Sequence, residues 1–419
     1  MSANVSAPST VTLIAGGGPA GMVLGFLLAR AGIEVLVLEK HADFFRDFRG
    51  DTIHPSTFQL IYELGLLDDF LRVPHQELRE IGAVIDDFTV TVANFSHLPV
   101  HCKFVGLMPQ WDFLNFIRDQ ARAYPQFHLL METEVIDLII ENNRVAGVRA
   151  KTKNGEQEFR AALTIGADGR HSIVREKAGF EVIDLGAPID VLWMRVSRQP
   201  GDPTQTLGRF RAGKILVTLD REDYWQCAYV IPKGEFPAIQ QKGLPAFRHD
   251  LESVAPFLQG RTLELKDWSG IKLLSVAVDR LRNWSRPGLL CIGDSAHAMS
   301  PIGGVGINLA IQDAVAAANA LAQPLSQQLS PSALDAHLHR VQNRRTFPTR
   351  MTQGLQVLAH KRFIGPALAL KAPLTRLPLP LALLKHFPIL RRIPARIVGL
   401  GFRPEHVHTP ASRGIQPRS

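Results

Sequence analysis

Two glycine-rich segments, far apart in the sequence, contain the residues best suited to binding a large phosphorylated cofactor. They are residues 16–21 (GGGPAG) and residues 293–308 (GDSAHAMSPIGGVGIN). In the first, Gly16, Gly18 and Gly21 have the G-x-G-x-x-G spacing of a dinucleotide-binding turn, which alone says only that some nucleotide binds. The second segment indicates that the chain returns to enclose the rest of one long cofactor. Together they favour FAD over a plain nicotinamide site.

Each position of the first segment has a physical reason. Gly16 permits the tight turn, Gly18 lets the backbone approach a pyrophosphate, and Gly21 allows close packing of helix on strand. Glu39 can accept hydrogen bonds from a ribose diol, and an acid there disfavours a 2′-phosphate, so NADP is not expected at this site. Pro19, Ala20 and Lys40 complete the predicted contacts of this segment.

These residues need a strand–turn–helix–strand unit to position them. Residues 11–15 are a short apolar run, typical of a buried parallel strand. Residues 22–30 have helical composition, and residues 34–38 indicate a second strand that ends at Glu39. A free helix N-terminus then faces the phosphates. The alternative, a glycine-rich turn with no ligand, is disfavoured by this context.

Two further strands are predicted to end in acids. Residues 163–167 precede Asp168, and residues 288–292 precede Gly293 and Asp294. Acids at the carboxyl ends of strands point into the ligand crevice of an open α/β sheet, which suits Asp294 to a ribityl hydroxyl. An Ala-rich helix is predicted from about residue 308 to 321. Its N-terminal dipole could stabilise negative charge on a reduced flavin.

Taken together, the motifs GxGxxG…Glu, DGxxSxVR and GDxxHxxxPxGGxGxNxxxxDA resemble those of the para-hydroxybenzoate hydroxylase family of single-component FAD monooxygenases. The resemblance covers nearly the whole chain, in order. It implies an α/β fold: a Rossmann-like FAD-binding domain, an inserted and mostly antiparallel β-sheet substrate domain, and a C-terminal helical segment.

The resemblance also implies roles for single residues. Arg49, in FRGDTIHP, would lie beside the flavin, and Gln110 near the FAD phosphates or ribityl chain. Asp168 would support FAD and the pyridine nucleotide, and Asp294 would bind the ribityl chain. The ADP half would be held by Gly16, Gly18, Gly21 and Glu39. The wall of the isoalloxazine near C4a would be formed by Pro301, Gly304, Gly306, Ile307 and Asn308.

Catalytic residues are harder to assign. The resemblance places Arg49 and Pro301 against the reacting flavin, but it names no base. Polar candidates for the substrate pocket are Tyr224, His54, His101 and Arg195. His54 could equally cap the helix that starts at about Pro55. For His297 a structural role is favoured over catalysis, and Arg175 either serves the site or pairs with a surface acid. No metal site is predicted.

The remaining sequence divides into two regions. Strand-like runs at residues 191–196, 215–219, 224–231 and 263–274 indicate an inserted sheet. The expected FAD-binding domain spans 1–76, 107–187 and 279–345, and the substrate domain spans 77–106 and 188–278. Residues 346–419 form the C-terminal segment, whose prolines prevent a long helix in residues 361–404.

Charge is unevenly distributed. The net charge of the chain is +8, but residues 361–419 contain eleven Lys and Arg and one acid. The net charge of residues 1–360 is therefore −2. The body is therefore not a nucleic-acid-binding surface. In residues 361–404, short helices packed on the body are one interpretation; a basic, apolar surface for anionic lipid is the other. Three cysteines, no signal peptide and no long apolar run predict a cytoplasmic protein, with the membrane periphery as an alternative.

The reaction implied by the resemblance is hydroxylation of an aromatic or electron-rich small molecule. NADH or NADPH would bind transiently and reduce tightly but non-covalently bound FAD, and O2 would form a flavin C4a-hydroperoxide. A halogenase is disfavoured because the tryptophan motif of that family is incomplete here. An oxidoreductase without oxygen insertion and a non-catalytic flavin-binding protein stay open. The chain is expected to be a monomer or a dimer.

Overall fold

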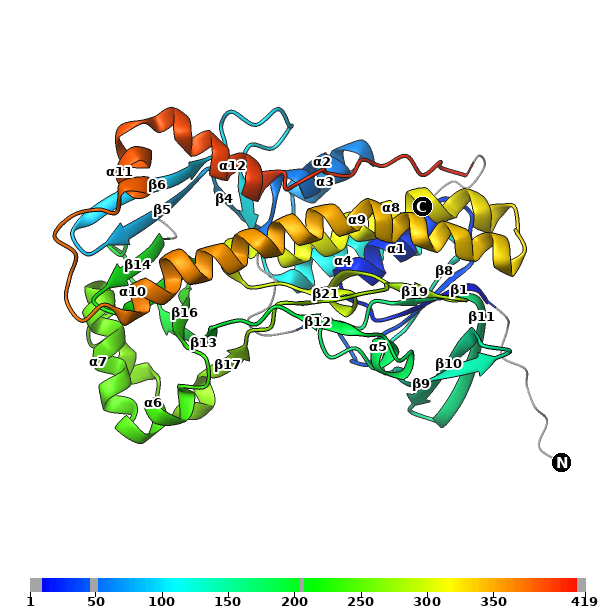
Figure 1. Cartoon of the computed structure of the whole chain (residues 1–419), viewed down its shortest axis with the longest axis horizontal. Coiled ribbons are helices and arrows are strands. Elements are labelled where there is room, and N and C mark those ends of the chain that lie inside the picture. The colour runs from blue at the N-terminus through cyan, green and yellow to red at the C-terminus, as the bar shows by residue number, and fades with distance from the viewer. Residues whose placement is uncertain (1–9, 46–51, 204–206, 413–419) are drawn as a thin grey trace.

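A parallel sheet forms the base of one half of the molecule, the half at the right of Figure 1. The computed structural model describes residues 10–45, 52–203 and 207–412. The sheet order is β20-β11-β1-β2-β8, and neighbouring strands on this path run parallel. Its central strands are apolar because they are buried inside the protein. The strands are β1 (Thr10–Ala15), β2 (Val35–Leu38), β8 (Phe127–Leu130), β11 (Gly155–Gly166) and β20 (Leu289–Cys291).

Shorter strands extend this base. Antiparallel β9 and β10 continue from the long strand β11, and β19 lies at the other edge. Two three-stranded sheets, β3-β7-β4 and β12-β18-β21, connect the base to the rest of the chain. Their bounds are β3 (Thr52–Ile53), β4 (Gln76–Leu78), β7 (Val105–Leu107), β9 (Glu134–Glu141), β10 (Arg144–Thr152), β12 (Val182–Asp184), β18 (Asp279–Leu281), β19 (Ser285–Arg286) and β21 (His297–Ala298).

Helix α1 is buried along almost its whole length between the parallel sheet and helix α8. Among the described residues, the stretch Ile302–Ser326 is long and apolar enough to cross a membrane, but 78% of its most apolar window is buried inside the protein. That burial is what a core helix requires. The helices of this half are α1 (Pro19–Arg30), α2 (Pro55–Glu63), α3 (Leu67–Leu71), α4 (Gln110–Arg122), α5 (Ile173–Lys177), α8 (Gly306–Ser326) and α9 (Pro331–Ala359).

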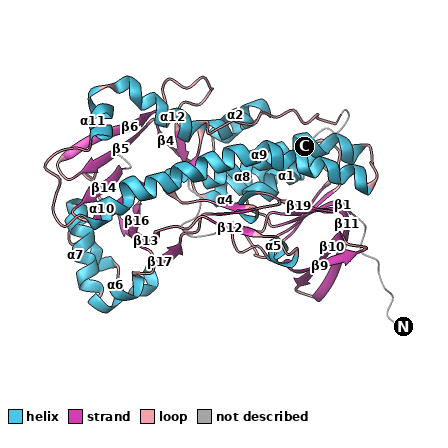
Figure 2. Cartoon of the chain, in the orientation of Figure 1, coloured by secondary structure: helices cyan, strands magenta, loops and turns pink. Residues whose placement is uncertain are grey.

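The second half is built on a seven-stranded sheet, seen at the left of Figure 2, in the order β17-β13-β16-β15-β14-β5-β6. It is antiparallel except where β14 pairs with β5. One face packs under α6 (Phe236–Lys242) and α7 (Leu244–Val254). The strands are β5 (Glu80–Ile85), β6 (Phe88–Asn94), β13 (Ile189–Ser197), β14 (Leu207–Arg211), β15 (Lys214–Asp220), β16 (Tyr224–Pro232) and β17 (Lys272–Ser275). The expected fold class is confirmed.

One strand prediction in this sheet is wrong. Of the strand-like run at residues 263–274, only the end forms a strand, β17. The preceding residues form the short 3-10 turns η2 (Arg261–Glu264) and η3 (Trp268–Gly270). Side-chain hydrogen bonds override the apolar pattern there: Arg261 pairs with Asp202, and Asp267 accepts a hydrogen bond from the Ser269 N–H.

Beyond α9 the chain breaks into short helices, as the prolines require. The π turn η6 and α10 follow directly, and α11, η7 and α12 then pack on β6. The expected start of the C-terminal segment, residue 346, lies inside α9, so that helix belongs to both regions. The bounds are η6 (His360–Ile364), α10 (Gly365–Ala369), α11 (Leu379–His386), η7 (Pro388–Arg391) and α12 (Arg392–Gly399).

The last described residues return to the first half of the molecule. The Asn319 side chain binds both His406 and His408 of this tail, and the Ser412 N–H donates to the Arg30 carbonyl at the end of α1. Figure 1 shows the tail lying beside α8 and α9. Residues 406–412 are therefore bound to α1 and α8, the helices that follow or contain the glycine-rich segments.

Candidate cofactor site

Four strands bring the predicted cofactor residues to one edge of the parallel sheet. Ala15 pairs with both Leu38 and Gly166, and Gly166 pairs with Cys291, so the carboxyl ends of β1, β2, β11 and β20 lie in line. The residues just beyond these ends include Gly16, Glu39, Asp168 and Asp294. Ligands of open α/β sheets bind outside such strand ends. Segments separated by more than a hundred residues thus form one site.

The glycine turn after β1 is tightly built. Gly16 has φ +109°, and a Cβ there would lie 2.3 Å from the Ala167 carbonyl oxygen; a Cβ on Gly21 would lie 2.0 Å from the Gly16 oxygen. Both positions therefore exclude any side chain. Gly18 differs, because a Cβ there would meet no atom within 4 Å. The open space beside Gly18, at the start of α1, fits the approach of a pyrophosphate to the backbone.

Glu39 is buried beside this turn, with 8% of its surface exposed. One carboxylate oxygen accepts from the Gly17 N–H at 2.9 Å and the other from the His41 N–H at 3.0 Å. These bonds fix the orientation of the carboxylate at the end of β2. Lys40 beside it is exposed. Glu39 thus organises the turn and stands where a ribose contact was predicted.

Asp168 is held by the start of helix α5. Its carboxylate accepts from the Ser172 hydroxyl and from the Val174 N–H. Burial raises the pKa of Asp168 despite these bonds. Arg175 of the same helix lies 3.3 Å from Asp279, a largely buried ion pair. The carboxylate of Asp168 therefore caps a helix, and its contact with FAD stays a prediction.

The second glycine-rich segment begins where α1 and α8 touch. Gly293 has φ +61°, and a Cβ there would lie 3.1 Å from the Cβ atoms of Ala20 and Ala310. The Ser295 hydroxyl lies 2.6 Å from the Gly166 carbonyl oxygen and so fixes the short turn η4 (Gly293–Ser295) to β11. Asp294 lies half-buried in this turn, close to the start of α1.

The loop before α8 is fastened to β3. Pro301 starts the turn η5 (Ile302–Gly304), and the Thr52 hydroxyl donates to the Gly304 carbonyl at 2.9 Å. The side-chain oxygen of Asn308 accepts from the His54 N–H and the Thr57 hydroxyl, both at 2.8 Å. Its amide nitrogen donates to the Thr52 carbonyl at 3.0 Å. The side chain of Asn308 thus serves the fold, which leaves its backbone for a cofactor contact. Gly306 and Ile307 form the first turn of α8.

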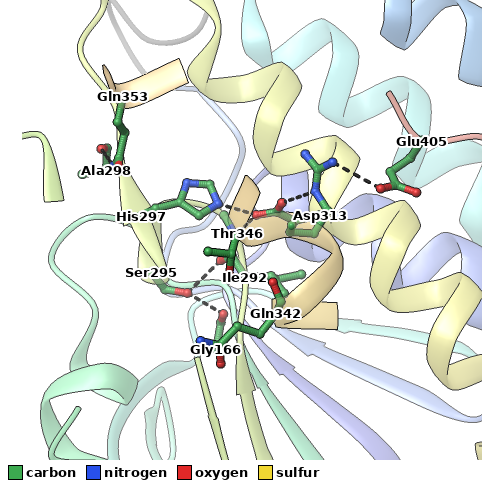
Figure 3. Close-up of polar contacts among 12 residues, drawn as sticks. Gly166, Ile292, Ser295, His297, Ala298, Asp313, Gln342, Thr346, Gln353 and Glu405 are labelled. Carbon is green, nitrogen blue, oxygen red and sulfur yellow. Dashed lines mark hydrogen bonds and ion pairs between the residues drawn. The ribbon is translucent and has the colours of Figure 1, made fainter. Parts of the chain in front are cut away.

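A buried charge network lies behind this segment, and the sequence did not reveal it (Figure 3). Asp313 of α8 lies 2.6 Å from His297 Nε2 and accepts from Arg345 Nε of α9 at 2.8 Å. A third bond to Asp313 comes from the Gly293 N–H at 3.0 Å. Glu405 of the tail lies 3.2 Å from Arg345 Nη1.

Charge balance keeps Asp313 ionised. Burial alone would raise the pKa of Asp313, but His297 and Arg345 hold it below its usual value. His297 is 1% exposed and has Asp313 as a partner, which agrees with the structural role favoured from sequence. His297 and Asp313 belong to the third motif, whereas no pattern marks Arg345 or Glu405. Their pairing depends on where the C-terminal tail returns.

The predicted polar candidates for the substrate pocket are scattered. His54 is buried, and its Nδ1 lies 2.7 Å from the Val398 carbonyl, so Nδ1 carries the proton. Burial lowers the pKa of His54 to about 4, although the nearby backbone carbonyls of Val398 and Gly303 raise it slightly. His101 is on the surface, stacked on Tyr62.

The other two candidates, Arg195 and Tyr224, lie together on the antiparallel sheet. The guanidinium of Arg195 is 4.8 Å from the centre of the Tyr224 ring. Gln110 is the first residue of α4, and its neighbour Trp111 packs on the Phe45 ring. The loop between Phe45 and β3 contains Arg49, which lies outside the described residues, so its predicted place beside the flavin stays a prediction.

A cavity of about 180 Å³ lies between α8, α9 and α12. Val305, Leu309 and Gln312 of α8 line it, whereas Ala310 of the same helix faces Gly293. At 100° per residue these are different faces of α8. The cavity therefore lies away from Gly293 but borders the predicted flavin wall, because Asn308 lines it together with Gly303 and His54.

The chain is similar to known proteins across most of its length. A family model described as FAD binding domain matches residues 9–354. A 6-methylpretetramide 4-monooxygenase of Streptomyces rimosus is 33% identical over 367 residues, 85% of each chain. A dialkyldecalin synthase of Streptomyces rugosporus is 27% identical over 346 residues, 78% of this chain and 68% of that protein. The crystal structure of a p-nitrophenol 4-monooxygenase from Pseudomonas putida DLL-E4 shares the fold, with a TM-score of 0.74 at 18% identity, covering 92% of this chain and 96% of the other.

Proposed function

The chain belongs to the FAD binding domain family of para-hydroxybenzoate hydroxylase-like monooxygenases, and from this premise we propose that it hydroxylates an aromatic or electron-rich small molecule with NADH or NADPH and O2. The observation that carries the proposal is the convergence of Gly16, Glu39, Asp168 and Asp294 at one sheet edge. Such an edge, with the open space at Gly18, is suited to an extended dinucleotide.

The chain's own residues would bind and orient FAD. The N–H groups at the start of α1 would meet the pyrophosphate, and Glu39 the adenosine ribose. Asp294 would hold the ribityl chain. The start of α8, at Gly306 and Ile307, would direct its positive dipole end toward the flavin ring. The remaining proposed contacts are Pro19, Ala20, Lys40, Arg49, Gln110, Asp168, Pro301, Gly304 and Asn308.

When bound, FAD would supply the redox chemistry, namely acceptance of a hydride from the nicotinamide and activation of O2 for oxygen transfer. The protein would orient the substrate and exclude water. Pro301 and Arg49 are proposed at the reacting face. No base is assigned, because His101 lies on the surface and the buried His54 donates its Nδ1–H to the Val398 carbonyl.

The antiparallel sheet is proposed to form the substrate wall. Leu192, Met194 and Val196 of β13 pack under the helices of the outer face. Because side chains alternate along a strand, Trp193 and Arg195 lie on the opposite face. Residues 77–106 and 188–278 would thus bind the substrate, and residues 1–76, 107–187 and 279–345 the cofactor. We also propose a cytoplasmic protein, monomeric or dimeric.

Substrate candidates follow from the relatives. The identity of 33% to a 6-methylpretetramide 4-monooxygenase makes 6-methylpretetramide the first compound to test, with p-nitrophenol as a small phenol for comparison. One relative is named as a dialkyldecalin synthase and not as a monooxygenase, and a shared fold does not by itself fix the reaction. A flavoprotein reaction without oxygen insertion is therefore the second candidate.

Isotope labelling distinguishes the two candidates. The holoenzyme is incubated with NADH or NADPH, the test compound and ¹⁸O2, and the mass of the product is measured by mass spectrometry. One ¹⁸O atom per hydroxylated product supports the proposal, together with NAD(P)H oxidation that the compound stimulates. A product that carries no label from O2 would refute the proposed hydroxylation.

A second experiment tests the cofactor site. Asp294→Ala should fold but lose most of its bound FAD, because the ribityl contact is removed. Asp279→Ala is the control, since it removes a buried acid that pairs with Arg175 instead. If Asp294→Ala stays yellow with unchanged FAD affinity, the assignment of Asp294 is wrong.

A further inference from the structure

The helices at the C-terminus expose large apolar side chains to solvent. Along α11, η7 and α12 (residues 379–399, the C-terminal ridge), Leu379 is 72% exposed, Phe387 55%, Ile389 64% and Ile393 60%. A run of such side chains in one short segment is unusual for an isolated protein and indicates a surface that meets another phase or molecule.

These side chains do not belong to the packing of the ridge on the body. Ala395 of α12 is buried, and a Cβ on Gly399 would lie 2.7 Å from Leu98 and 3.2 Å from Phe95. Ile393 is two residues before Ala395, and at 100° per residue it faces nearly the opposite way. The helix thus has a filled inner face, and its outer face exposes Ile393 between Arg392 and Arg396.

The same surface is strongly basic. Residues 361–404 contain nine Lys and Arg and no Asp or Glu. Lys385, Arg392 and Arg396 of the ridge are exposed. Arg391 donates to the Leu384 and Lys385 carbonyls at the end of α11, so it stiffens the joint between the helices. Because residues 1–360 sum to −2, the positive charge is a local property of this face.

Charge decides between the occupants that could cover this face. A two-fold dimer would set the basic ridge against itself, with no acid in residues 361–404 to neutralise it. A nucleic acid would match the charge but would leave Leu379, Phe387, Ile389 and Ile393 without an apolar environment. An anionic lipid surface offers phosphates to the basic side chains and acyl chains to the apolar ones.

We propose that the C-terminal ridge docks the protein on the surface of an anionic lipid bilayer. Phe387, Ile389 and Ile393 enter the boundary between headgroups and acyl chains, while Lys385, Arg392 and Arg396 lie at the lipid phosphates. Ile397 and Val398 on the inner side of α12 line the 180 Å³ cavity, so docking brings one wall of that cavity close to the membrane.

Vesicle flotation of the full-length holoenzyme tests the proposal. Vesicles of phosphatidylcholine with about 30% phosphatidylglycerol are compared with pure phosphatidylcholine at about 100 mM salt, where charge attraction is still effective near the surface. We expect flotation with the anionic vesicles only. Each basic side chain near such a surface raises the binding constant about fivefold, so K385Q/R392Q/R396Q should weaken binding about a hundredfold.

Two matched controls separate docking from general attraction. K242Q/K266Q/K272Q removes the same charge from exposed positions outside the ridge and should weaken binding less than about threefold. F387S/I389S/I393S should abolish flotation, whereas L263S, at a site 66% exposed elsewhere, should not. Unchanged FAD absorbance shows that each variant is folded.

Three results would overturn the proposal. The first is wild-type protein that does not float with anionic vesicles. The second is equal weakening by the two charge triples, since attraction would then not depend on the ridge. The third is a concentration-dependent dimer in sedimentation that F387S/I389S/I393S abolishes, because a second copy would then cover this face. None of these results bears on oxygen incorporation, so the proposed function is tested separately.

Discussion

The buried network around Asp313 offers a sharp test, through Arg345→Met. Arg345 is 1% exposed and bridges Asp313 and Glu405. Methionine has a similar length and fits a buried site, but it carries no charge. The substitution leaves Asp313 with His297 and the Gly293 N–H, and leaves Glu405 with Arg344.

Removing one member of a buried ion pair costs about 3–5 kcal/mol, because the partner stays buried without its counter-charge. The remaining partners of Asp313 place the expected cost toward the lower end, at about 3 kcal/mol. Globular proteins unfold with an entropy of about 2.1 cal/mol/K per residue, or roughly 0.9 kcal/mol/K for a chain of this length. The melting temperature should therefore fall by about 3–4 °C.

The neighbouring Arg344 provides the control. It contacts the same carboxylate, with Nε 2.7 Å from Glu405 Oε1, but its side chain is 37% exposed. A solvent-exposed pair contributes below about 1 kcal/mol, so Arg344→Met should lower the melting temperature by no more than about 1 °C. Both variants lose one positive charge next to Glu405, but Arg345 is buried and pairs with Asp313 as well.

Two measurements are made on each variant: thermal unfolding followed by circular dichroism, and release of FAD followed by fluorescence. Arg345→Met should also release FAD more readily, because Asp313 holds the Gly293 N–H next to Asp294. Equal melting temperatures for Arg345→Met and Arg344→Met would refute the reasoning, since burial would then not set the cost of breaking the network.

Three more predictions concern single residues. Gly21→Ala should prevent correct folding of the turn, because its Cβ would lie 2.0 Å from the Gly16 oxygen, whereas Gly18→Ala should keep the melting temperature of the apoprotein and lose FAD; a Gly18→Ala protein with normal FAD content would contradict this. His54 has its pKa lowered to about 4 in the folded state, below its ordinary value of 6.5, so the unfolded chain takes up a proton first as the pH falls. The free energy of unfolding is therefore unaffected by His54 above about pH 6.5 and falls by about 3 kcal/mol toward pH 4. In His54→Gln this fall should be absent from the free energy of unfolding measured with denaturant across that pH range. Asn308→Ala should lower the melting temperature by about 2–4 °C, because it leaves the buried His54 N–H without its acceptor; an unchanged value in calorimetry would argue against a structural role for that side chain.

Local chemistry made the cofactor half of the fold predictable. The spacing of Gly16, Gly18 and Gly21 predicted the turn, and the structure shows why two of them exclude a side chain. Apolar runs that end in Glu39 and before Asp294 predicted parallel strands, and the register then placed both ends at one edge. These features depend on neighbours in the sequence and on the continuous apolar runs of buried parallel strands.

Contacts between distant segments were not predictable in this way. The apolar run at residues 263–274 reads as a strand, yet beside the ion pair of Arg261 with Asp202 and the cap at Asp267 it forms two short 3-10 turns before β17. Asn308 matches a cofactor motif, but its side chain is taken up by Thr57 and the backbone of β3 and α2. Contacts of this kind join residues far apart in the sequence, so they leave no periodic pattern in it.

The sequence by itself determined which chemistry this protein supports, since glycine turns and strand-end acids are local requirements of dinucleotide binding. It also determined that the C-terminal charge is concentrated in one segment. The tertiary structure alone decided that Arg345 and Glu405 close over Asp313, and that α12 turns Ala395 inward and Ile393 outward. The physical reason is that burial and pairing are set by how the returning tail packs on α8 and α9, and no residue spacing encodes where that tail comes to lie.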